Sequence, residues 1–321
     1  MDKKTYSNLV VSSAPHIVSN MDTSRIMLMV LIGLAPSLLV STYVFGFRVI
    51  TLSLVCVVAA MFFEWAWNKL MHKPQTVGDL SAAVTGLLIA FNVPSGLPYW
   101  IAILGCFVAI VIVKQLFGGM GKNIVNPAIT ARVILFISYA TEMTTWTLPR
   151  MAADATSTAT PLGVLAEGGQ LPSNMQMFLG FIGGSMGEVS AVALLIGGLF
   201  LIWKKIISPI IPACFIGTVF VFALIYYGVT GEGEALQMAV FHILAGGVML
   251  GAFFMATDYV TSPLLPMGKV IFGIGCGLIT MIIRIWGQYP EGVSFSILLM
   301  NCLTPLINNF AEKRMYGGAK K

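Results

Sequence analysis

The chain has 321 residues, of which 57% are hydrophobic and only 10% are charged. Soluble globular domains carry about 25% charged residues, so this composition excludes an ordinary soluble enzyme. The formal net charge is +5, but Lys and Arg are scattered singly or in pairs, without the basic stripe of a nucleic-acid-binding protein. We therefore predict an all-α polytopic membrane protein that binds no nucleic acid.

About ten segments are apolar enough to approach the roughly 20 residues that a membrane-crossing helix needs. Residues 1–25 precede them and lack a short apolar run with a cleavage site, so we expect no removable signal peptide. The third segment is short. The predicted spans are Ile26–Phe45, Val49–Leu70, Leu80–Val93, Tyr99–Leu116, Pro127–Thr145, Met186–Trp203, Pro209–Gly228, Leu236–Ala256, Val270–Trp286 and Val293–Phe310.

The distribution of basic residues predicts the orientation of these spans. With ten spans both termini share a side, and the loops on that side hold fourteen Lys and Arg residues, against three on the other side. Cytoplasmic loops carry the excess of Lys and Arg. We expect both termini to be cytoplasmic, and the loop after the fifth span, which contains Thr160, to be extracytoplasmic.

Two stretches of equal length, Gly86–Pro98 and Gly251–Pro263, each end a predicted span and break into a polar loop that contains proline. This weak echo divides the chain into two halves of five spans. Because five is odd, the halves would have opposite orientation, the inverted-repeat layout in which broken helices meet near the midplane. The predicted organisation is a cytoplasmic segment (1–25), a first five-helix repeat (26–145), an extracytoplasmic loop (146–185), a second five-helix repeat (186–310) and a cytoplasmic tail (311–321).

The glycine-rich stretch Lys114–Ala128 begins at the end of the fourth predicted span. Gly118, Gly119 and Gly121 allow the backbone to approach a ligand closely, between Lys114 and Lys122. Asn126 precedes a proline that opens the next helix. The stretch is read either as a ligand-binding loop or as a tight cytoplasmic turn whose lysines follow the positive-inside rule.

The decapeptide Asp154–Gly163 is rich in hydroxyl side chains, and its exit through Pro161 favours a loop. By composition alone it is a flexible polar loop. Farther on, Asp258 lies at the end of a span beside hydroxyls, where it either binds Na⁺ or a proton or caps a helix.

Charged residues in or near the predicted spans are candidates for an ion path or for structural pairing, because isolated charges in lipid cost several kcal/mol. The sequence does not pair them. The histidines and cysteines have no metal-ligand spacing, so we assign no metal site. The charged candidates are Glu64, Asp79, Arg132, Glu188 and Arg284.

Several of these stretches resemble motifs of one family, the membrane subunits of the Rnf complexes and of the related Na⁺-pumping quinone reductases. The resemblance covers nearly the whole chain and is strongest to the D subunit of Rnf. The stretches that carry it are Ala14-Pro15-His16, Lys114–Ala128, Asp154–Thr160, Ala256–Pro263 and Gly287–Phe295.

The resemblance implies a fold similar to urea transporters and a role as one membrane subunit of a ferredoxin:NAD⁺ oxidoreductase that moves Na⁺ or H⁺. It implies FMN joined by a phosphoester to Thr160, within a flavinylation motif that includes Asp154, Ser157 and Ala159. Thr158 departs from the motif, which has glycine there. A second, noncovalent flavin, either riboflavin or FMN, would lie at Lys114, Gly118, Gly119 and Asn126.

The implied partners are the other membrane and peripheral subunits, a flavin transferase, the lipid bilayer and the coupling ion, for which Asp258 and Glu64 are candidate path residues. No catalytic residue is assigned. The alternatives are the B subunit of a Na⁺-pumping quinone reductase, a solute channel or transporter, which inverted repeats would equally predict, and a scaffold subunit without a cofactor.

Overall fold

The computed structural model describes residues 22–147, 160–180, 182–231, 233–287 and 291–315, and the side chains of these up to residue 312. Within these residues every regular element is a helix, and no strand occurs. The all-α prediction is therefore confirmed for the described part of the chain.

Five helices are long and apolar enough to cross a membrane, and a sixth span results if one bent pair of helices is counted as a unit. Their outward faces expose large apolar side chains such as Leu39, Leu54 and Val229, as lipid-facing surfaces do. The chain is thus a membrane protein. The long helices are α1 (Thr23–Phe45), α2 (Arg48–Leu70), α10 (Ile210–Thr230), α13 (Pro266–Trp286) and α14 (Val293–Met315).

The bent pair joins α11 (Ala235–Leu244) to α12 (Val248–Leu250) and the π-helical segment η4 (Gly251–Met255), with a bend of 60°. The sequence predicted one continuous span here, and the structure breaks it. The physical reason is that Gly246 and Gly247 have φ angles of +65° and +70°, which end a right-handed helix.

The other predicted spans coincide with shorter apolar helices, so whether each crosses the bilayer stays a prediction. The sixth predicted span begins five residues late because residues 186–190 are not helical, and the fifth is interrupted at Tyr139. These helices are α3 (Ser81–Phe91), α4 (Tyr99–Phe107) continued by the π-helical η3 (Val108–Gln115), α5 (Pro127–Ser138) followed by α6 (Ala140–Thr144), and α9 (Ala191–Trp203).

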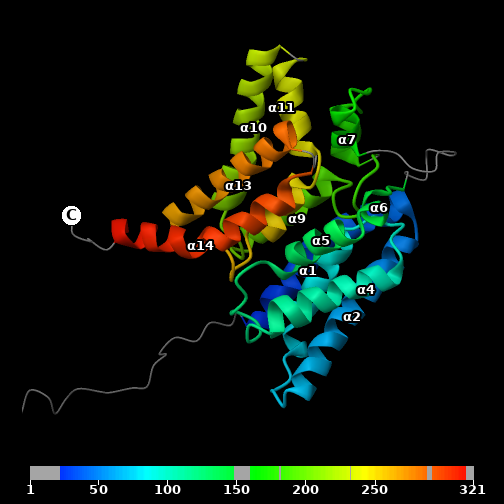
Figure 1. Ribbon diagram of the computed structural model, residues 1–321, viewed down its shortest axis with the longest axis vertical. Coiled ribbons are helices and arrows are strands. Elements are labelled where there is room, and N and C mark those ends of the chain that lie inside the picture. The colour runs from blue at the N-terminus through cyan, green and yellow to red at the C-terminus, as the bar shows by residue number, and fades with distance from the viewer. Residues whose placement is uncertain (1–21, 148–159, 181, 232, 288–290, 316–321) are drawn as a thin grey trace, which may run out of the picture.

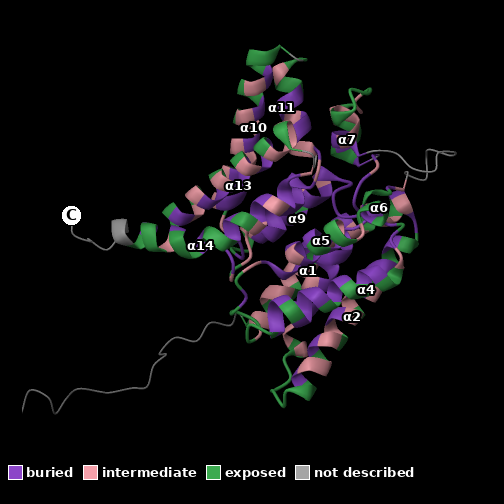
Figure 2. Ribbon diagram, viewed as in Figure 1, coloured by how far each residue is buried: buried purple, intermediate pink, exposed green. Residues whose placement is uncertain are grey.

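Three short elements complete the described chain: η2 (Val77–Asp79), α7 (Pro161–Ala166) and α8 (Asn174–Leu179). Figure 1 shows α1, α2, α4 and α5 together on one side and α10, α11, α13 and α14 on the other, with α9 between them. Buried residues gather where α1, α5 and α9 lie, whereas the far ends of α2 and α10 are exposed (Figure 2). The core therefore lies between the two groups of helices.

The two groups are joined by a close helix crossing between α1 and α9. A Cβ atom added at Gly197 would lie 1.9 Å from the carbonyl oxygen of Gly33, and one added at Gly198 would lie 2.4 Å from the ring of Phe253. Small residues let helix backbones approach in membrane proteins. The glycine pair on α9 thus sets how closely α9 packs against α1 on one side and η4 on the other.

We expect Gly197→Ala to lower the free energy of unfolding by about 1–3 kcal/mol, because the methyl group overlaps backbone that cannot yield as a side chain does. The measurement is the apparent melting temperature of the purified protein in detergent. Gly217→Ala on α10 is the matched control, since nothing lies within 4 Å of an added Cβ there. Equal melting temperatures for the two variants would contradict the crossing as described.

Candidate functional site

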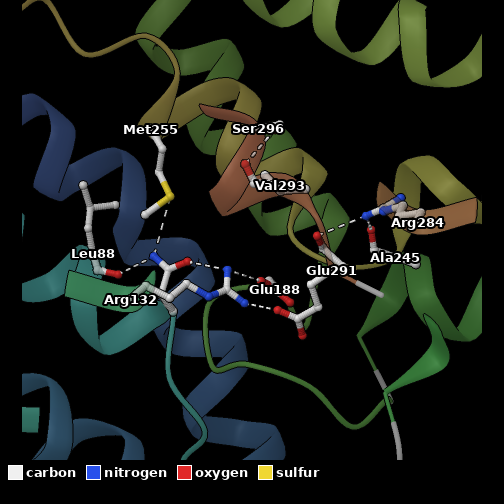
Figure 3. Close-up of polar contacts among 11 residues, drawn as sticks. Leu88, Arg132, Glu188, Ala245, Met255, Arg284, Glu291, Val293 and Ser296 are labelled. Atoms are coloured by element: carbon white, nitrogen blue, oxygen red, sulfur yellow. Dashed lines mark hydrogen bonds and ion pairs between the residues drawn. The ribbon is translucent and has the colours of Figure 1, made fainter. Parts of the chain in front are cut away.

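Two interrupted helices end beside each other in the core, although their ends are 163 residues apart. The side chain of Asn92, directly after α3, donates to the carbonyl oxygen of Leu88 at 2.6 Å and to the sulfur of Met255 at 3.6 Å. Met255 ends η4, and its carbonyl oxygen accepts from Asn126 Nδ2 at 3.2 Å. Because helix C-termini carry partial negative charge, this junction favours a cation (Figure 3).

The cation present at the junction is the guanidinium of Arg132, which projects from α5. Its Nη1 donates to Asn92 Oδ1 at 2.9 Å and to Glu188 Oε1 at 3.3 Å, and its Nη2 contacts the carboxylate of Glu291. Arg132 is 6% exposed. A buried guanidinium needs such partners, because an unpaired charge in a protein core costs several kcal/mol.

Glu188 reaches this junction because residues 185–190 wrap around the end of α3. The backbone N–H of Gly187 donates to the carbonyl oxygen of Phe91 at 2.8 Å, and that of Met186 to Val93 at 3.3 Å. A Cβ atom at Gly187 would lie 2.4 Å from Cβ of Phe91, so only glycine fits. On the other side, Ser37 of α1 donates to the carbonyl oxygen of Gly187 at 3.2 Å.

A second buried arginine, Arg284 on α13, satisfies the backbone at the bend between α11 and α12. It donates to the carbonyl oxygens of His242 at 2.6 Å, Ala245 at 2.8 Å and Gly246 at 3.1 Å. These carbonyls lose their helical partners at the bend, so the guanidinium replaces the missing N–H groups. Arg284 interacts electrostatically with Glu188 and Glu291, which Figure 3 shows in the same region as Arg132. We call these two arginines and two glutamates the central charge cluster.

A separate polar group surrounds Glu64 of α2, which is 1% exposed. Its Oε1 accepts from Lys114 Nζ at 2.9 Å, from Gln115 Nε2 at 3.0 Å and from Thr76 Oγ1 at 2.9 Å. Lys114 also donates to Ser81 Oγ at 2.6 Å. The predicted path residue and the predicted flavin-contacting lysine are thus partners in one ion pair.

A cavity of about 300 Å³ lies beside this ion pair. Three residues singled out in the sequence, Lys114, Asn126 and Asp258, line it together. Its size is at the lower end of ligand pockets, which have mostly apolar walls and a few polar groups. Its other polar lining residues are Thr23, Ser81, Thr85, Asn123, Thr257 and Tyr259, and its walls include Phe253 and Phe254.

Gly118 and Gly119 do not line this cavity. Their φ angles are +114° and +96°, and a Cβ atom at Gly118 would lie 2.7 Å from the side chain of Lys122. They form the turn between η3 and α5. For these two residues the structure thus favours a tight turn over a ligand-binding loop.

Asp258 is half-buried in the loop after η4, where Thr261 Oγ1 donates to its Oδ2 at 3.1 Å. Burial raises the pKa of this carboxyl above its usual value, against the opposing effect of the hydrogen bonds from Thr261 and the Val260 backbone. Burial disfavours the charged form and therefore favours a bound proton or cation. The helix-capping alternative is not supported, because the next helix, α13, begins at Pro266 with Leu265 as its N-cap, and the 3.5 Å contact from Val260 N–H to Asp258 lies within a turn.

Thr160 is the N-cap of α7, and its Oγ1 accepts from the backbone N–H of Gly163 at 3.2 Å. It is 5% exposed, whereas the composition of the stretch predicted a flexible polar loop. A cavity of about 70 Å³ adjoins it and is lined also by Arg132 and Glu291. Asp154, Ser157 and Ala159 lie outside the described residues.

The sequence analysis therefore selected most of the charged residues that form buried ion pairs, but it did not predict which of them pair with each other. Arg132 and Glu188 pair with each other, and Glu64 pairs with Lys114. Asn92 was missed as a site residue. The available signal was its position in the first of the two echoing stretches, at the end of the third predicted span.

The fold and the site define a class: a polytopic helical membrane protein whose interrupted helices meet at a buried charge cluster. The chain belongs to the NQR2, RnfD, RnfE family, whose model matches residues 10–317.

Curated relatives match over almost their full length. The chain is 50% identical over 317 residues to the D subunit of the Na⁺-translocating ferredoxin:NAD⁺ oxidoreductase complex of Acetobacterium woodii, covering 98% of this chain and 96% of that one. It is 42% identical over 320 residues to the D subunit of the proton-translocating complex of Clostridium ljungdahlii, covering 96% of each. It is 35% identical to the D subunit of the ion-translocating oxidoreductase complex of Actinobacillus succinogenes, covering 96% of this chain and 97% of the relative.

We expect Arg132→Gln to destabilise the protein by about 3–5 kcal/mol, because it leaves buried Glu188 and half-buried Glu291 without their partner. Adding Glu188→Gln removes one of the orphaned charges and should recover part of the loss. Apparent melting temperatures in detergent measure both effects. Arg48→Gln is the control, because Arg48 is exposed and donates to backbone carbonyls, and its loss should cost less, about 1.5–3 kcal/mol. Equal losses for Arg132→Gln and Arg48→Gln would contradict the central role of Arg132.

Proposed function

We propose that this chain is the D subunit of an ion-translocating ferredoxin:NAD⁺ oxidoreductase complex, embedded in the cell membrane and assembled with the complex's other membrane and peripheral subunits. The single observation that carries the proposal is the similarity to named D subunits over nearly the whole of both chains. A B subunit of a Na⁺-pumping quinone reductase is the alternative within the same family. A solute channel from another class has no use for the Thr160 stretch.

The proposed architecture is two inverted repeats of five spans, with both termini cytoplasmic. In each half the second helix packs against the third and fourth elements: α2 against α3 and α4, and α10 against α11 and α13. Asn126 and Glu291 each lie just before the helix that begins the last proposed span of their half, α5 and α14. Asn126 reaches the end of η4 in the other half, and Glu291 reaches Arg132, which supports a pseudo-symmetric relation.

Thr160 is proposed as the attachment point of FMN. Its hydroxyl oxygen bonds to the phosphorus of the FMN half of FAD, the phosphoanhydride bond breaks, AMP leaves, and the hydroxyl proton is released. A flavin transferase carries out this step, and the N-cap contact with Gly163 must open for it, because the hydroxyl is buried. A bound flavin supplies one- and two-electron redox chemistry.

A second, noncovalent flavin, riboflavin or FMN, is proposed for the cavity lined by Lys114, Asn126 and Asp258. The residues present fit such a group. Amide, hydroxyl and ammonium groups converge on apolar and aromatic walls, as in other cofactor pockets. Glu64 holds the Lys114 ammonium at the cavity wall. Gly118 and Gly119 support this site only indirectly, by turning the chain between Lys114 and Asn126.

For the coupling ion, the relatives' names give no single answer, because one names Na⁺ and another names the proton. Asp258 is the proposed contact residue, since its carboxyl adjoins the large cavity and its charged form is incompletely solvated. Glu64 is proposed to act through its ion pair with Lys114.

The covalent flavin is tested on a denaturing gel under ultraviolet light, with the chain produced alongside its flavin transferase. We expect a fluorescent band for the wild type, a band for Thr160→Ser, which keeps a hydroxyl acceptor, and none for Thr160→Val. Thr144→Val is the matched control, because Thr144 lines the same cavity, and it should keep the band. A dark wild-type band would remove the covalent-flavin proposal.

The role of Asp258 is tested by ferredoxin-dependent NAD⁺ reduction by the complex at varied Na⁺ concentration and pH. Because burial raises the pKa of Asp258, its protonated form persists to higher pH. The Na⁺ concentration needed for half-maximal rate should rise as pH falls through this pKa, and Asp258→Asn should abolish that dependence. Asp22→Asn, at the N-cap of α1, is the control. An Asp258→Asn complex with wild-type dependence would contradict the assignment.

The raised pKa of Asp258 also makes the stability of the folded protein depend on pH. A carboxyl whose pKa is raised in the folded state binds protons more tightly there than in the unfolded chain. The contribution of Asp258 to the free energy of unfolding therefore increases as the pH falls from the pKa of the carboxyl in the folded state to its ordinary pKa near 3.8. Asp258→Asn should remove this part of the pH dependence of the melting temperature.

A further inference from the structure

The small cavity beside Thr160 combines an attachment hydroxyl with a buried cation. Arg132, Glu291 and Thr160 line it together, with Ser294, Trp146 and Phe295. These residues come from α5, from α14 and the residues before it, and from the segments on either side of residues 148–159. The cavity thus has an arginine and a glutamate in the same lining as the threonine that would carry a phosphoester.

We propose that this cavity holds the phosphate of the flavin phosphoester on Thr160, with Arg132 as its counter-ion, and that Glu291 gives up its contact with Arg132 when the phosphate arrives. This inference rests on the proposed flavinylation of Thr160 and concerns the positioning of the tethered group. Arg132 is a positioning residue in this role.

The volume of the cavity decides which part of the flavin it accepts. At about 70 Å³ it is well below the roughly 300–1,000 Å³ of pockets that enclose drug-sized ligands. A phosphate group is a few atoms wide, whereas the three-ring isoalloxazine is a drug-sized ligand. The phosphate is therefore held inside, and the ring extends beyond the cavity.

The sum of the charges around Arg132 changes when the phosphate is added, so one carboxylate must change its position or its protonation. The central charge cluster contains Arg132 and Arg284 against Glu188 and Glu291, so it is neutral before modification. The phosphoester adds one negative charge, and a third buried anion beside two arginines would be left without a full partner. One carboxylate must leave the guanidinium or take up a proton.

Glu291 is the carboxylate with freedom to move. Its side chain is 17% exposed, against 6% for Glu188, and its Oε1 has no hydrogen-bond partner among the described residues. Glu188 has less room to move, because its carboxylate packs against the backbone of Gly247. A Cβ atom added at Gly247 would lie only 2.4 Å from Glu188 Oε1. In the unmodified chain Glu291 thus occupies the anion position that the phosphate takes over.

The test is a comparison of Glu291→Gln in two preparations of the same complex, made with and without the flavin transferase. Without flavin, the substitution removes a partner of Arg132 and should lower the apparent melting temperature. With flavin, the phosphate already pairs Arg132, and the lowering should be less than half as large. The control is Glu64→Gln, which breaks the ion pair with Lys114 and should give the same shift in both preparations.

A second measurement needs no variant. Carbodiimide coupling of glycine ethyl ester, read by peptide mass spectrometry, should label Glu291 more in the flavinylated complex than in the unmodified one, while labelling of Glu188 stays unchanged. Equal labelling of Glu291 in both, or equal melting shifts for Glu291→Gln in both, would overturn the inference.

The two proposals fail in distinguishable ways. A wild-type band that is dark under ultraviolet light, despite a competent transferase, removes flavinylation and this inference together. A fluorescent wild-type band combined with flavin-independent behaviour of Glu291 removes the phosphate site alone.

Discussion

The buried guanidinium of Arg132 imposes a constraint that several parts of the chain must satisfy together. A charge in a core is tolerated only with partners, and these come from the break after α3, from residues 185–190 and from the residue before Gly292. Each segment must leave regular helix to deliver its side chain. The interruption of the helices and the pairing of the charges are therefore two aspects of one arrangement.

Met255 connects this arrangement to the larger cavity. Its sulfur contacts the Asn92 side chain, which accepts from Arg132, and its carbonyl oxygen accepts from Asn126, which lines the cavity that we assign to a second flavin. The two proposed flavin positions thus adjoin opposite ends of one continuous set of polar contacts. A helix break that supplies free backbone groups at such a place is typical of transport proteins.

Close backbone packing holds these parts at fixed distances. Gly197 on α9 meets the backbone of Gly33 on α1, and Gly187, in the segment before α9, meets the Phe91 side chain, so α9 and the segment before it pack directly against the first group of helices. Packing of this kind between small residues stabilises membrane helices where the hydrophobic effect does not. Motion between the two halves would have to separate these contacts and the central charge cluster at the same time.

The sequence by itself determined the membrane character, the helical class, the approximate bounds of the long helices and the family, because long apolar runs and local motifs are read from neighbouring residues. It also selected Thr160, Lys114, Asn126 and Asp258 as candidates. Only the tertiary structure decided that Glu64 pairs with Lys114, that Arg132 joins Glu188 and Glu291, and that α11 bends away from η4 at Gly246. Pairings across 50 to 159 residues depend on how helices pack, and no local pattern in the chain encodes that packing.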